Sequence, residues 1–498
     1  MLHIVFALLL SDADTGPLTA TALTPSQVFA NAKAAIGKLR DGTFEVRSHG
    51  TGGGETVTTD EIADGDDYSV VTKNGPFEWR SGKSNGQSWW RNANGAVILN
   101  SDYRSTLQTP WALAMKHPED PKSGVRVMGI TVSPPQQIVV EIHPQGEQDQ
   151  YRYYDAKTSL LTRIVTYTKT GTKETSDFMD YRTLFGETRP FHSHFSDGSP
   201  EDEWDAYVDS VEPAPQSHVA NVAVPRPLFS LPDGKPAAVP VHFTRNGIVV
   251  TAAVNGKPVN FLLDSGASNL VIDSGFAASL GAKSYGHHGA DIGGKVDRSQ
   301  TMLDSVDIGD LHLRNVAFTE LPFSQNDDGY QVSGLLGFDF IASSVVQIDF
   351  KAGTVTLLPR SSFDPDALHL NQVQAQLDDG IPRVQMSSEG VPGWFVLDTG
   401  SFVTMAYRQY VDKLPSAPMV QSDDDHFIAV GGENAAERRA LSDVVFGGIK
   451  FGVVYAMMPK TAHFELYGYD GLLGRDVLAE YKIYFDYLDG SVYVTPNV

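Results

Sequence analysis

Two matched segments place an aspartate beside a hydroxyl residue and a glycine. The first reads Phe-Leu-Leu-Asp-Ser-Gly over 261–266, and the second reads Phe-Val-Leu-Asp-Thr-Gly over 395–400. Two carboxyl groups held close together cannot both ionise cheaply, so they share one proton. One of them then acts as a base toward a water molecule while the other acts as an acid. Asp264 and Asp398 are therefore the candidate catalytic residues.

The two segments belong to a longer internal repeat. Gly-Leu-Leu-Gly occurs at 334–337 and again at 471–474, and Ile-Asp-Phe at 348–350 is answered by Phe-Asp-Tyr at 485–487. The copies are separated by 134 residues at the aspartates and by 137 residues at the later segments. Three ordered matches at nearly constant spacing indicate a duplicated β-rich unit. We expect its first half over 241–360 and its second half over 375–498.

The doubled motif resembles that of the retropepsin-like and pepsin-like aspartic proteases. The resemblance covers about half of the chain and implies a duplicated retropepsin-like β-barrel pseudo-dimer, with Asp264 and Asp398 in one active site. It further implies an aspartic endopeptidase that acts on a peptide or protein substrate as a monomer. No cofactor and no metal are required, because an activated water is the nucleophile. The isolated Asp-Thr-Gly at 14–16 follows no apolar strand and is not counted.

Residues beside each aspartate have expected supporting roles. Glycine allows a tight turn, and the backbone N–H groups of Gly266 and Gly400 are expected to donate to the carboxylates. The resemblance assigns Ser265 and Thr399 to hydrogen bonds between the two loops. Two further serines are plausible donors near the carboxylates. They are Ser268 and Ser401.

A glycine pair lies between each aspartate and its Gly-Leu-Leu-Gly segment. In the family that the chain resembles, this zone is a β-hairpin flap that closes over the substrate. An ordinary hairpin turn is the alternative interpretation. The flap candidates are Gly293, Gly294, Gly431 and Gly432.

The residue pattern of the N-terminal block, 24–212, predicts an antiparallel sheet with one helix. Alternating strands are expected at 43–47, 68–71, 138–142 and 161–165. The block weakly resembles the periplasmic lipoprotein-carrier domains, and this resemblance implies a curved antiparallel sheet and a possible apolar ligand. A Pro-rich stretch over 213–240 has the composition of a linker.

The helix is predicted from its start signal and its apolar stripe. Thr24 can cap it, with Pro25 in the first turn and Gln27 completing a capping box. The apolar stripe, expected to be buried, includes Ile36 and continues to Leu39, and Gly42 is expected to close the helix.

Composition excludes several classes of function. The formal net charge of the 498 residues is −23, which disfavours binding to nucleic acid. The absence of cysteine excludes disulfides, thiol nucleophiles and cysteine-ligated metals. No apolar run is long enough for an integral membrane segment. The apolar stretch Leu2–Leu10 and a small-residue site near Ala22 suggest a signal peptide over 1–22, so we expect a periplasmic or secreted protein.

Three alternatives remain open at this point. Each half could pair with a half of another chain, giving a homodimer with two sites. The chain could also be a non-catalytic peptide- or lipid-binding envelope protein that retains the aspartic-protease fold, or a structural envelope protein.

His192 and His194, two residues apart, could bind a metal, but no third ligand is evident.

Overall fold

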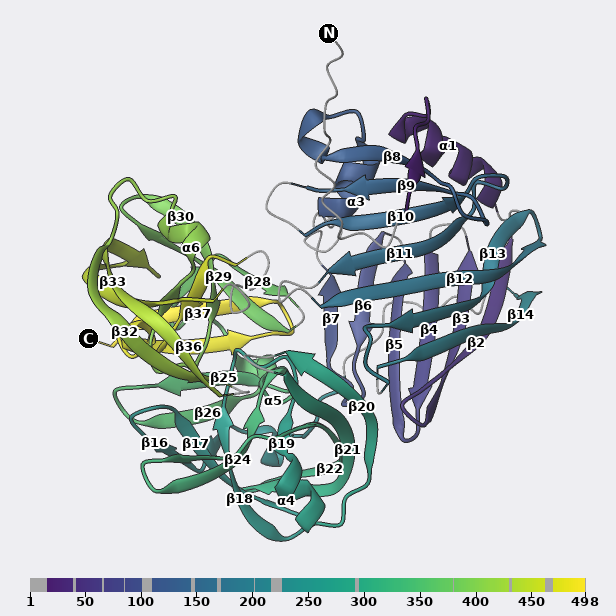
Figure 1. Cartoon of the computed structure of the whole chain (residues 1–498). Coiled ribbons are helices and arrows are strands. Elements are labelled where there is room, and N and C mark those ends of the chain that lie inside the picture. The colour runs from purple at the N-terminus through teal and green to yellow at the C-terminus, as the bar shows by residue number, and fades with distance from the viewer. Residues whose placement is uncertain are drawn as a thin grey trace. The chain divides into compact units, whose positions relative to one another are not determined.

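The computed structural model describes residues 16–38, 42–64, 67–84, 86–100, 110–144, 148–167, 172–200, 202–215, 226–291, 295–378, 380–429, 432–461 and 469–497. The chain is mainly β and forms two compact units (Figure 1). The first unit comprises 1–42, 48–50 and 106–211, and the second comprises 43–47, 51–105 and 212–498. Strand β2 (Thr43–Gly52) is divided between them.

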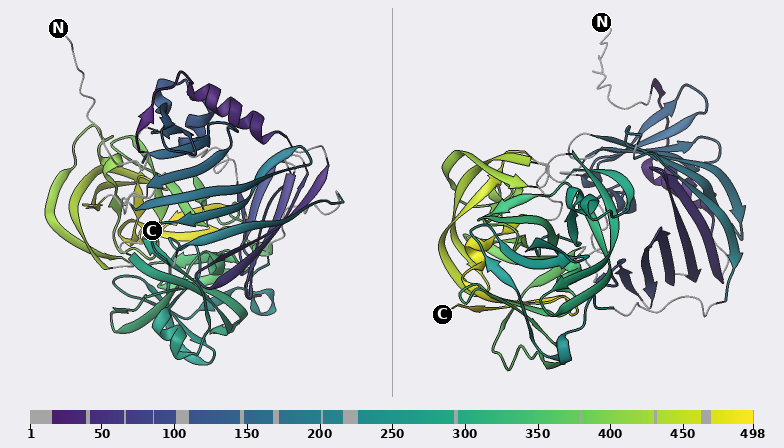
Figure 2. Two further views of the ribbon diagram at one scale, coloured as in Figure 1. Left: turned by 45° about the vertical axis from the view of Figure 1, so that its right-hand side comes forward. Right: turned by 90° about the horizontal axis from the view of Figure 1, so that it is seen from below.

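The first unit is an antiparallel sheet with helices packed on one face. Its strand order is β1-β8-β9-β10-β11-β12-β13-β14, and Figure 2 shows the sheet as a curved layer. Helices α1 (Pro25–Ile36) and α3 (Pro110–Lys116) bury Val28, Ala32 and Ala114 against apolar residues of the sheet. The strands are β1 (Leu18–Thr19), β8 (Val125–Thr131), β9 (Gln137–Ile142), β10 (Gln150–Asp155), β11 (Leu161–Tyr167), β12 (Lys173–Leu184), β13 (Glu187–Ser196) and β14 (Trp204–Pro213).

Helix α1 starts as the sequence predicts but ends earlier. Thr24 caps it and both hydrogen bonds of the capping box with Gln27 are present. The helix closes at Gly37, whose φ of 72° is a conformation that glycine adopts easily. The expected end at Gly42 was therefore wrong, because the glycine at 37 stops the helix before the apolar period does. Ile36, expected in the buried stripe, is 40% exposed.

The second unit begins with an antiparallel meander in sequence order. Its strands are β3 (Glu55–Asp64), β4 (Asp67–Asn74), β5 (Phe77–Ser84), β6 (Gln87–Arg91) and β7 (Val97–Asn100). The short turn between β6 and β7 carries two asparagines, Asn92 and Asn94. Trp89, in β6, is 2% exposed, which agrees with a packing role.

The first repeat folds into a sheet with the strand order β16-β17-β18-β24-β19-β22-β21-β20, with β23 paired to β24. Two short helices, α4 (Ser274–Ser279) and α5 (Phe338–Ile341), follow β19 and β24. The strands are β16 (Val241–Phe243), β17 (Ile248–Val254), β18 (Lys257–Leu263), β19 (Val271–Asp273), β20 (Ser284–Asp291), β21 (Lys295–Ile308), β22 (Leu311–Leu321), β23 (Gln325–Asp327) and β24 (Tyr330–Leu336).

The second repeat has the same topology, with the order β28-β29-β30-β35-β31-β34-β33-β32. Its short helices are α6 (Arg408–Val411) and α7 (Arg475–Leu478). The matching strand orders confirm the duplicated β unit that the sequence predicts. The strands are β28 (Ala375–Asp378), β29 (Ile381–Ser388), β30 (Val391–Leu397), β31 (Met405–Ala406), β32 (Met419–Ala429), β33 (Gly432–Phe446), β34 (Ile449–Pro459) and β35 (Gly471–Leu473).

A third sheet joins the two repeats. Its order is β15-β26-β25-β36-β37-β27, in which β25 and β26 come from the first repeat and β36 and β37 from the second. The central pair, β25 with β36, is antiparallel, and its end is tied by an ion pair of 2.9 Å between Asp349 and Lys482. The strands are β15 (Ala237–Val239), β25 (Val345–Asp349), β26 (Thr354–Leu358), β27 (Asn371–Val373), β36 (Tyr481–Asp486) and β37 (Ser491–Pro496). The two repeats are thus held in one unit by a shared sheet.

Within the described ranges, no helix is long and apolar enough to cross a membrane.

Candidate active site

Each candidate aspartate follows the last residue of a buried strand. Strand β18 ends at Leu263 and β30 ends at Leu397, and both leucines are fully buried. Each strand pairs in parallel with the Gly-Leu-Leu segment of its own repeat. The backbone N–H of Asp264 donates to Leu336 O, and that of Asp398 donates to Leu473 O, both at 3.0 Å. The downstream segments therefore hold the two aspartate loops in place.

Ser265 and Thr399 link the two loops through reciprocal hydrogen bonds. The backbone N–H of Ser265 donates to Thr399 Oγ1, and that of Thr399 donates to Ser265 Oγ, each at 3.0 Å. Each hydroxyl then donates to the opposite strand end, Ser265 to Leu397 O at 2.6 Å and Thr399 to Leu263 O at 2.8 Å. Both residues are buried. The four bonds fix the spacing of the loops.

These four hydrogen bonds, which interlock the two loops, lead to a prediction about the stability of the chain. Thr399→Val removes one acceptor and one donor and leaves Ser265 N–H and Leu263 O buried without those partners. At about 1 kcal/mol for each bond, plus the cost of unpaired buried groups, we expect a loss of about 2–4 kcal/mol. Urea unfolding of the full chain measures the loss, with the exposed Thr354→Val as the control. A loss no larger than that of the control would contradict the interlock.

The backbone around each carboxyl group supplies donors. Gly266 N–H donates to Asp264 Oδ1, and Gly400 N–H donates to Asp398 Oδ1, both at 2.8 Å. The N–H of Ser401 also donates to Asp398 Oδ1, at 3.1 Å, while its hydroxyl donates to Val403 O. The hydroxyl of Ser268 instead accepts from Asn269.

The two carboxyl groups face each other across the repeats. A Cβ added to Gly400 would lie 2.6 Å from the Asp264 carboxyl carbon, and one added to Gly266 would lie 2.8 Å from that of Asp398. Burial, and then the charge of Asp398, raise the pKa of Asp264 well above its usual value. Burial also raises the pKa of Asp398, while a hydrogen bond from Asp264 opposes that rise. The pair is therefore arranged to keep one proton between two carboxyl groups.

Two residues near the dyad escaped the sequence reasoning. Tyr487 is 3% exposed, and its hydroxyl has no hydrogen-bond partner among the described residues. Burial, and then the charges of Asp264 and Asp398, raise the pKa of its phenol. Arg475 donates from Nη1 to the carbonyls of Thr244 and Gly247, at 2.7 and 3.0 Å.

Arg475 therefore ties the second repeat to the first. Its only signal in the sequence is the position after Gly474 in the second copy, where the first copy has Phe338. Tyr487 likewise replaces Phe350 of the first copy. Differences between the copies, rather than their common residues, mark both positions.

The flap candidates lie mostly outside the described residues. Gly293, Gly294 and Gly431 fall there, whereas Gly432 opens β33. The flanking strands pair up to Asp291 with Lys295 in one repeat and up to Ala429 with Gly432 in the other. Both zones thus have antiparallel strands on either side, and a flap role stays a prediction.

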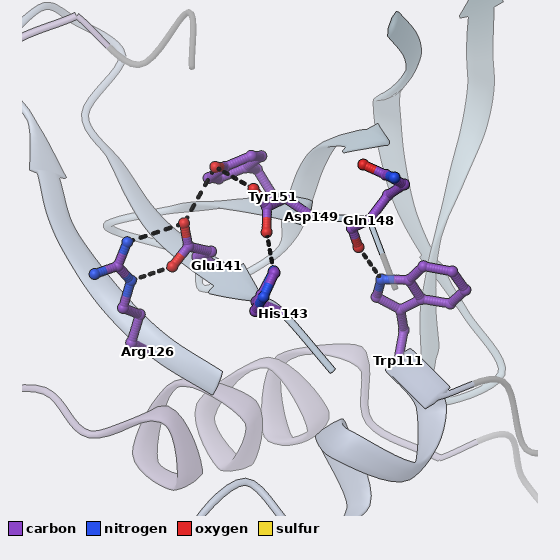
Figure 3. Close-up of polar contacts among 7 residues, drawn as sticks. All are labelled: Trp111, Arg126, Glu141, His143, Gln148, Asp149 and Tyr151. Atoms are coloured by element: carbon purple, nitrogen blue, oxygen red, sulfur yellow. Dashed lines mark hydrogen bonds and ion pairs between the residues drawn. The ribbon is translucent and has the colours of Figure 1, made fainter. Parts of the chain in front are cut away.

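Other polar clusters lie outside the dyad. In the first unit, Tyr151 donates to Glu141 at 3.1 Å and to Asp149 at 3.4 Å, and Arg126 Nη2 pairs with Glu141 at 3.0 Å (Figure 3). Each charge in this network has a partner, so it ties β8, β9 and β10 together. His192 and His194 share one oxygen of Asp205. Among the described residues, no group of three ligands is placed to hold a metal ion.

Comparison with known proteins gives one family match. Residues 250–340, which include Asp264, match the model of the Aspartyl protease family. No curated protein matches the chain.

Three solved structures are similar to parts of the chain at low sequence identity. The aspartic proteinase from Irpex lacteus is similar at 12% identity and a TM-score of 0.35, covering 52% of this chain and 97% of that one. A LolA superfamily protein from Nitrosomonas europaea is similar at 12% identity and a TM-score of 0.29, covering 40% and 99%. A DUF1329 family protein from Desulfovibrio piger is similar at 11% identity and a TM-score of 0.28, covering 39% and 98%. The family match confirms, over residues 250–340, the resemblance of the chain to aspartic proteases.

Proposed function

We propose that this chain is an aspartic endopeptidase whose single active site is formed by Asp264 and Asp398. The observation that carries the proposal is the approach of the two carboxyl groups, each on a glycine turn of a matched loop. The reciprocal bonds of Ser265 and Thr399 support an active site formed within one chain, and hence a monomer. Light scattering combined with activity tests this point, since activity confined to a dimer would contradict it.

In the proposed mechanism, one carboxylate removes a proton from a water molecule that attacks the peptide carbonyl. The other carboxyl group gives its proton to the carbonyl oxygen, which stabilises the tetrahedral intermediate. Burial raises the pKa of both carboxyl groups, so the pair holds one proton, and the member without it is the base. Neither role requires a cofactor.

The pH dependence follows from the shared proton. Since the pKa of Asp264 is raised well above its usual value, the singly protonated pair persists as the pH rises above the normal range for aspartate. We expect kcat/KM to fall only when the pH passes the upper pKa of the pair, where both groups ionise. Cleavage of a diverse peptide pool measured across about pH 3–8 checks this profile. A rate that rises steadily to the alkaline end would contradict it.

The same assay separates the alternative function. If the folded full chain cleaves no peptide at any pH, the alternative function becomes the better hypothesis: a non-catalytic peptide- or lipid-binding envelope protein that retains the aspartic-protease fold. An apolar ligand of the N-terminal block would then be the first thing to seek. A periplasmic or secreted location remains part of the proposal, and it rests on the apolar stretch Leu2–Leu10 and the small-residue site near Ala22.

A further inference from the structure

The two repeats differ in the surroundings of the aspartate that follows Gly-Leu-Leu-Gly, which is buried in the first copy and exposed in the second. Asp339 follows Gly-Leu-Leu-Gly-Phe in the first copy, and Asp476 follows Gly-Leu-Leu-Gly-Arg in the second. Asp339 is 1% exposed, and burial raises its pKa to about 6. A carboxylate at such a depth needs several donors, since each missing hydrogen bond is costly there.

In the second repeat the donors are local. Asp476 Oδ1 accepts from the backbone N–H of Thr404 at 2.9 Å and from its hydroxyl at 2.7 Å. Thr404 lies six residues after Asp398, on the loop of that catalytic residue. Thr404 thus fastens the loop of Asp398 to Asp476 in α7 through two hydrogen bonds.

In the first repeat the corresponding hydroxyl is missing. Six residues after Asp264 stands Leu270, whose backbone N–H donates to Asp339 Oδ2 at 3.1 Å. A leucine has no second donor to offer. The missing bond comes instead from Asn92, whose side-chain Nδ2 donates to Asp339 Oδ1.

The turn between β6 and β7 is built to aim this amide. Asn92 is 4% exposed, and its Oδ1 accepts from the backbone N–H of Ala96 at 3.0 Å, which orients the side-chain NH2 group. Asn94 pairs with both backbone atoms of Ala317 in β22, at 2.9 and 2.8 Å, and so fixes the turn on the first repeat. Asn94 adds a second side-chain hydrogen bond to Asp339 beside its bond to Ala317 O, since an amide NH2 group has two N–H donors.

We propose that Asn92 is a positioning residue for the loop of Asp264, replacing the hydroxyl that Thr404 provides in the second repeat. Asn92 holds Asp339, and Asp339 holds the loop at Leu270. The neighbouring Phe338 N–H donates to Ala267 O at 2.9 Å, so the loop is fastened at two points. The effect of Asn92 on catalysis rests on the proposed function, whereas its effect on the position of the Asp264 loop does not.

The test compares two matched variants of the full chain by hydrogen exchange. Asn92→Ala removes the donor in the first repeat, and Thr404→Val removes the equivalent donor in the second. We expect Asn92→Ala to speed exchange about tenfold or more in peptides covering 264–270, with little change in 398–404. Thr404→Val is expected to give the opposite pattern. Equal changes in both loops, or none in 264–270, would overturn the proposal.

Kinetics of the same variant separate positioning from mere stability. Asn92→Ala is expected to lower kcat about tenfold while KM stays within about twofold, because the loop carries Asp264 rather than the substrate contacts. An unchanged kcat in folded Asn92→Ala enzyme would leave Asn92 a structural residue only. If wild type cleaves nothing, the proposed function fails, yet the exchange result still decides whether Asn92 fastens the loop.

A rescue experiment probes the replacement directly. Leu270→Thr supplies the hydroxyl at the position of Thr404, so adding it to Asn92→Ala is expected to restore slow exchange over 264–270. A folded double variant that still exchanges rapidly would refute the equivalence of the two donors. Should the loss of the buried leucine prevent folding, the single variants decide.

Discussion

Replacing Asp264 by asparagine is expected to abolish peptide cleavage, with a loss in kcat of about a thousandfold or more. The same loss is expected for Asp398→Asn, because an amide can neither accept the proton of the water nor share a proton with the remaining carboxyl group. Kinetics of each purified variant at the optimal pH of the wild type measures the effect. Asp366→Asn, which changes an exposed residue in a turn, is the control.

Stability provides a second readout of the same variants. A carboxyl group whose pKa is raised in the folded state contributes most below its unfolded pKa, and this contribution is lost as the pH rises through the folded value. The pKa of both aspartates is raised. The asparagine variants are therefore expected to have a higher Tm than wild type at neutral pH and no advantage near pH 3. Lower stability at neutral pH would contradict the crowding of the two charges.

Residual activity would identify a different arrangement. If each asparagine variant kept about half of the wild-type rate, the repeats would work in separate sites. The reciprocal bonds between Ser265 and Thr399 argue against that outcome, since separating the loops would leave both pairs unmade.

The sequence predicted the duplicated fold because both copies keep the residues that build it. Buried runs ending at Leu263 and Leu397, and the Gly-Leu-Leu segments beside them, are local patterns that need no knowledge of distant contacts. The close approach of the two aspartates was implied by the resemblance to aspartic proteases, since a repeat alone does not bring its two copies together. The positions of the strands could be read in the same way, since alternation is a local signal.

Contacts between distant segments could not be predicted in this way. Asn92 and Asp339 are 247 residues apart, and nothing around Asn92 distinguishes its turn from other turns rich in asparagine. Arg475 reaches Thr244 across 231 residues. What could have drawn attention to both is a mismatch between the copies, Leu270 against Thr404 and Phe338 against Arg475. Where a repeat drops a donor, a partner from elsewhere must replace it if the buried acceptor is kept.

Gly400→Ala is expected to reduce kcat about a hundredfold or more without removing any chemical group from the dyad. The added Cβ would lie 2.6 Å from the Asp264 carboxyl carbon and 2.8 Å from its oxygens, closer than side chains pack. The loop cannot easily retreat, because Gly400 N–H is bound to Asp398 Oδ1 and the neighbouring Thr399 is bonded across to the first repeat. The carboxyl group of Asp264 must therefore move away from Asp398.

Gly452→Ala is the matched control for this variant, because a Cβ there meets no atom within 4 Å. It is expected to keep the activity of the wild type, while both variants remain folded by circular dichroism. The displaced carboxyl group should also titrate more independently, so the pH profile of any residual activity is expected to lose its steep alkaline limb. A Gly400→Ala enzyme with wild-type kcat would show that the two carboxyl groups tolerate a wider separation than a shared proton allows, and the dyad mechanism would have to be abandoned even if both aspartates proved essential.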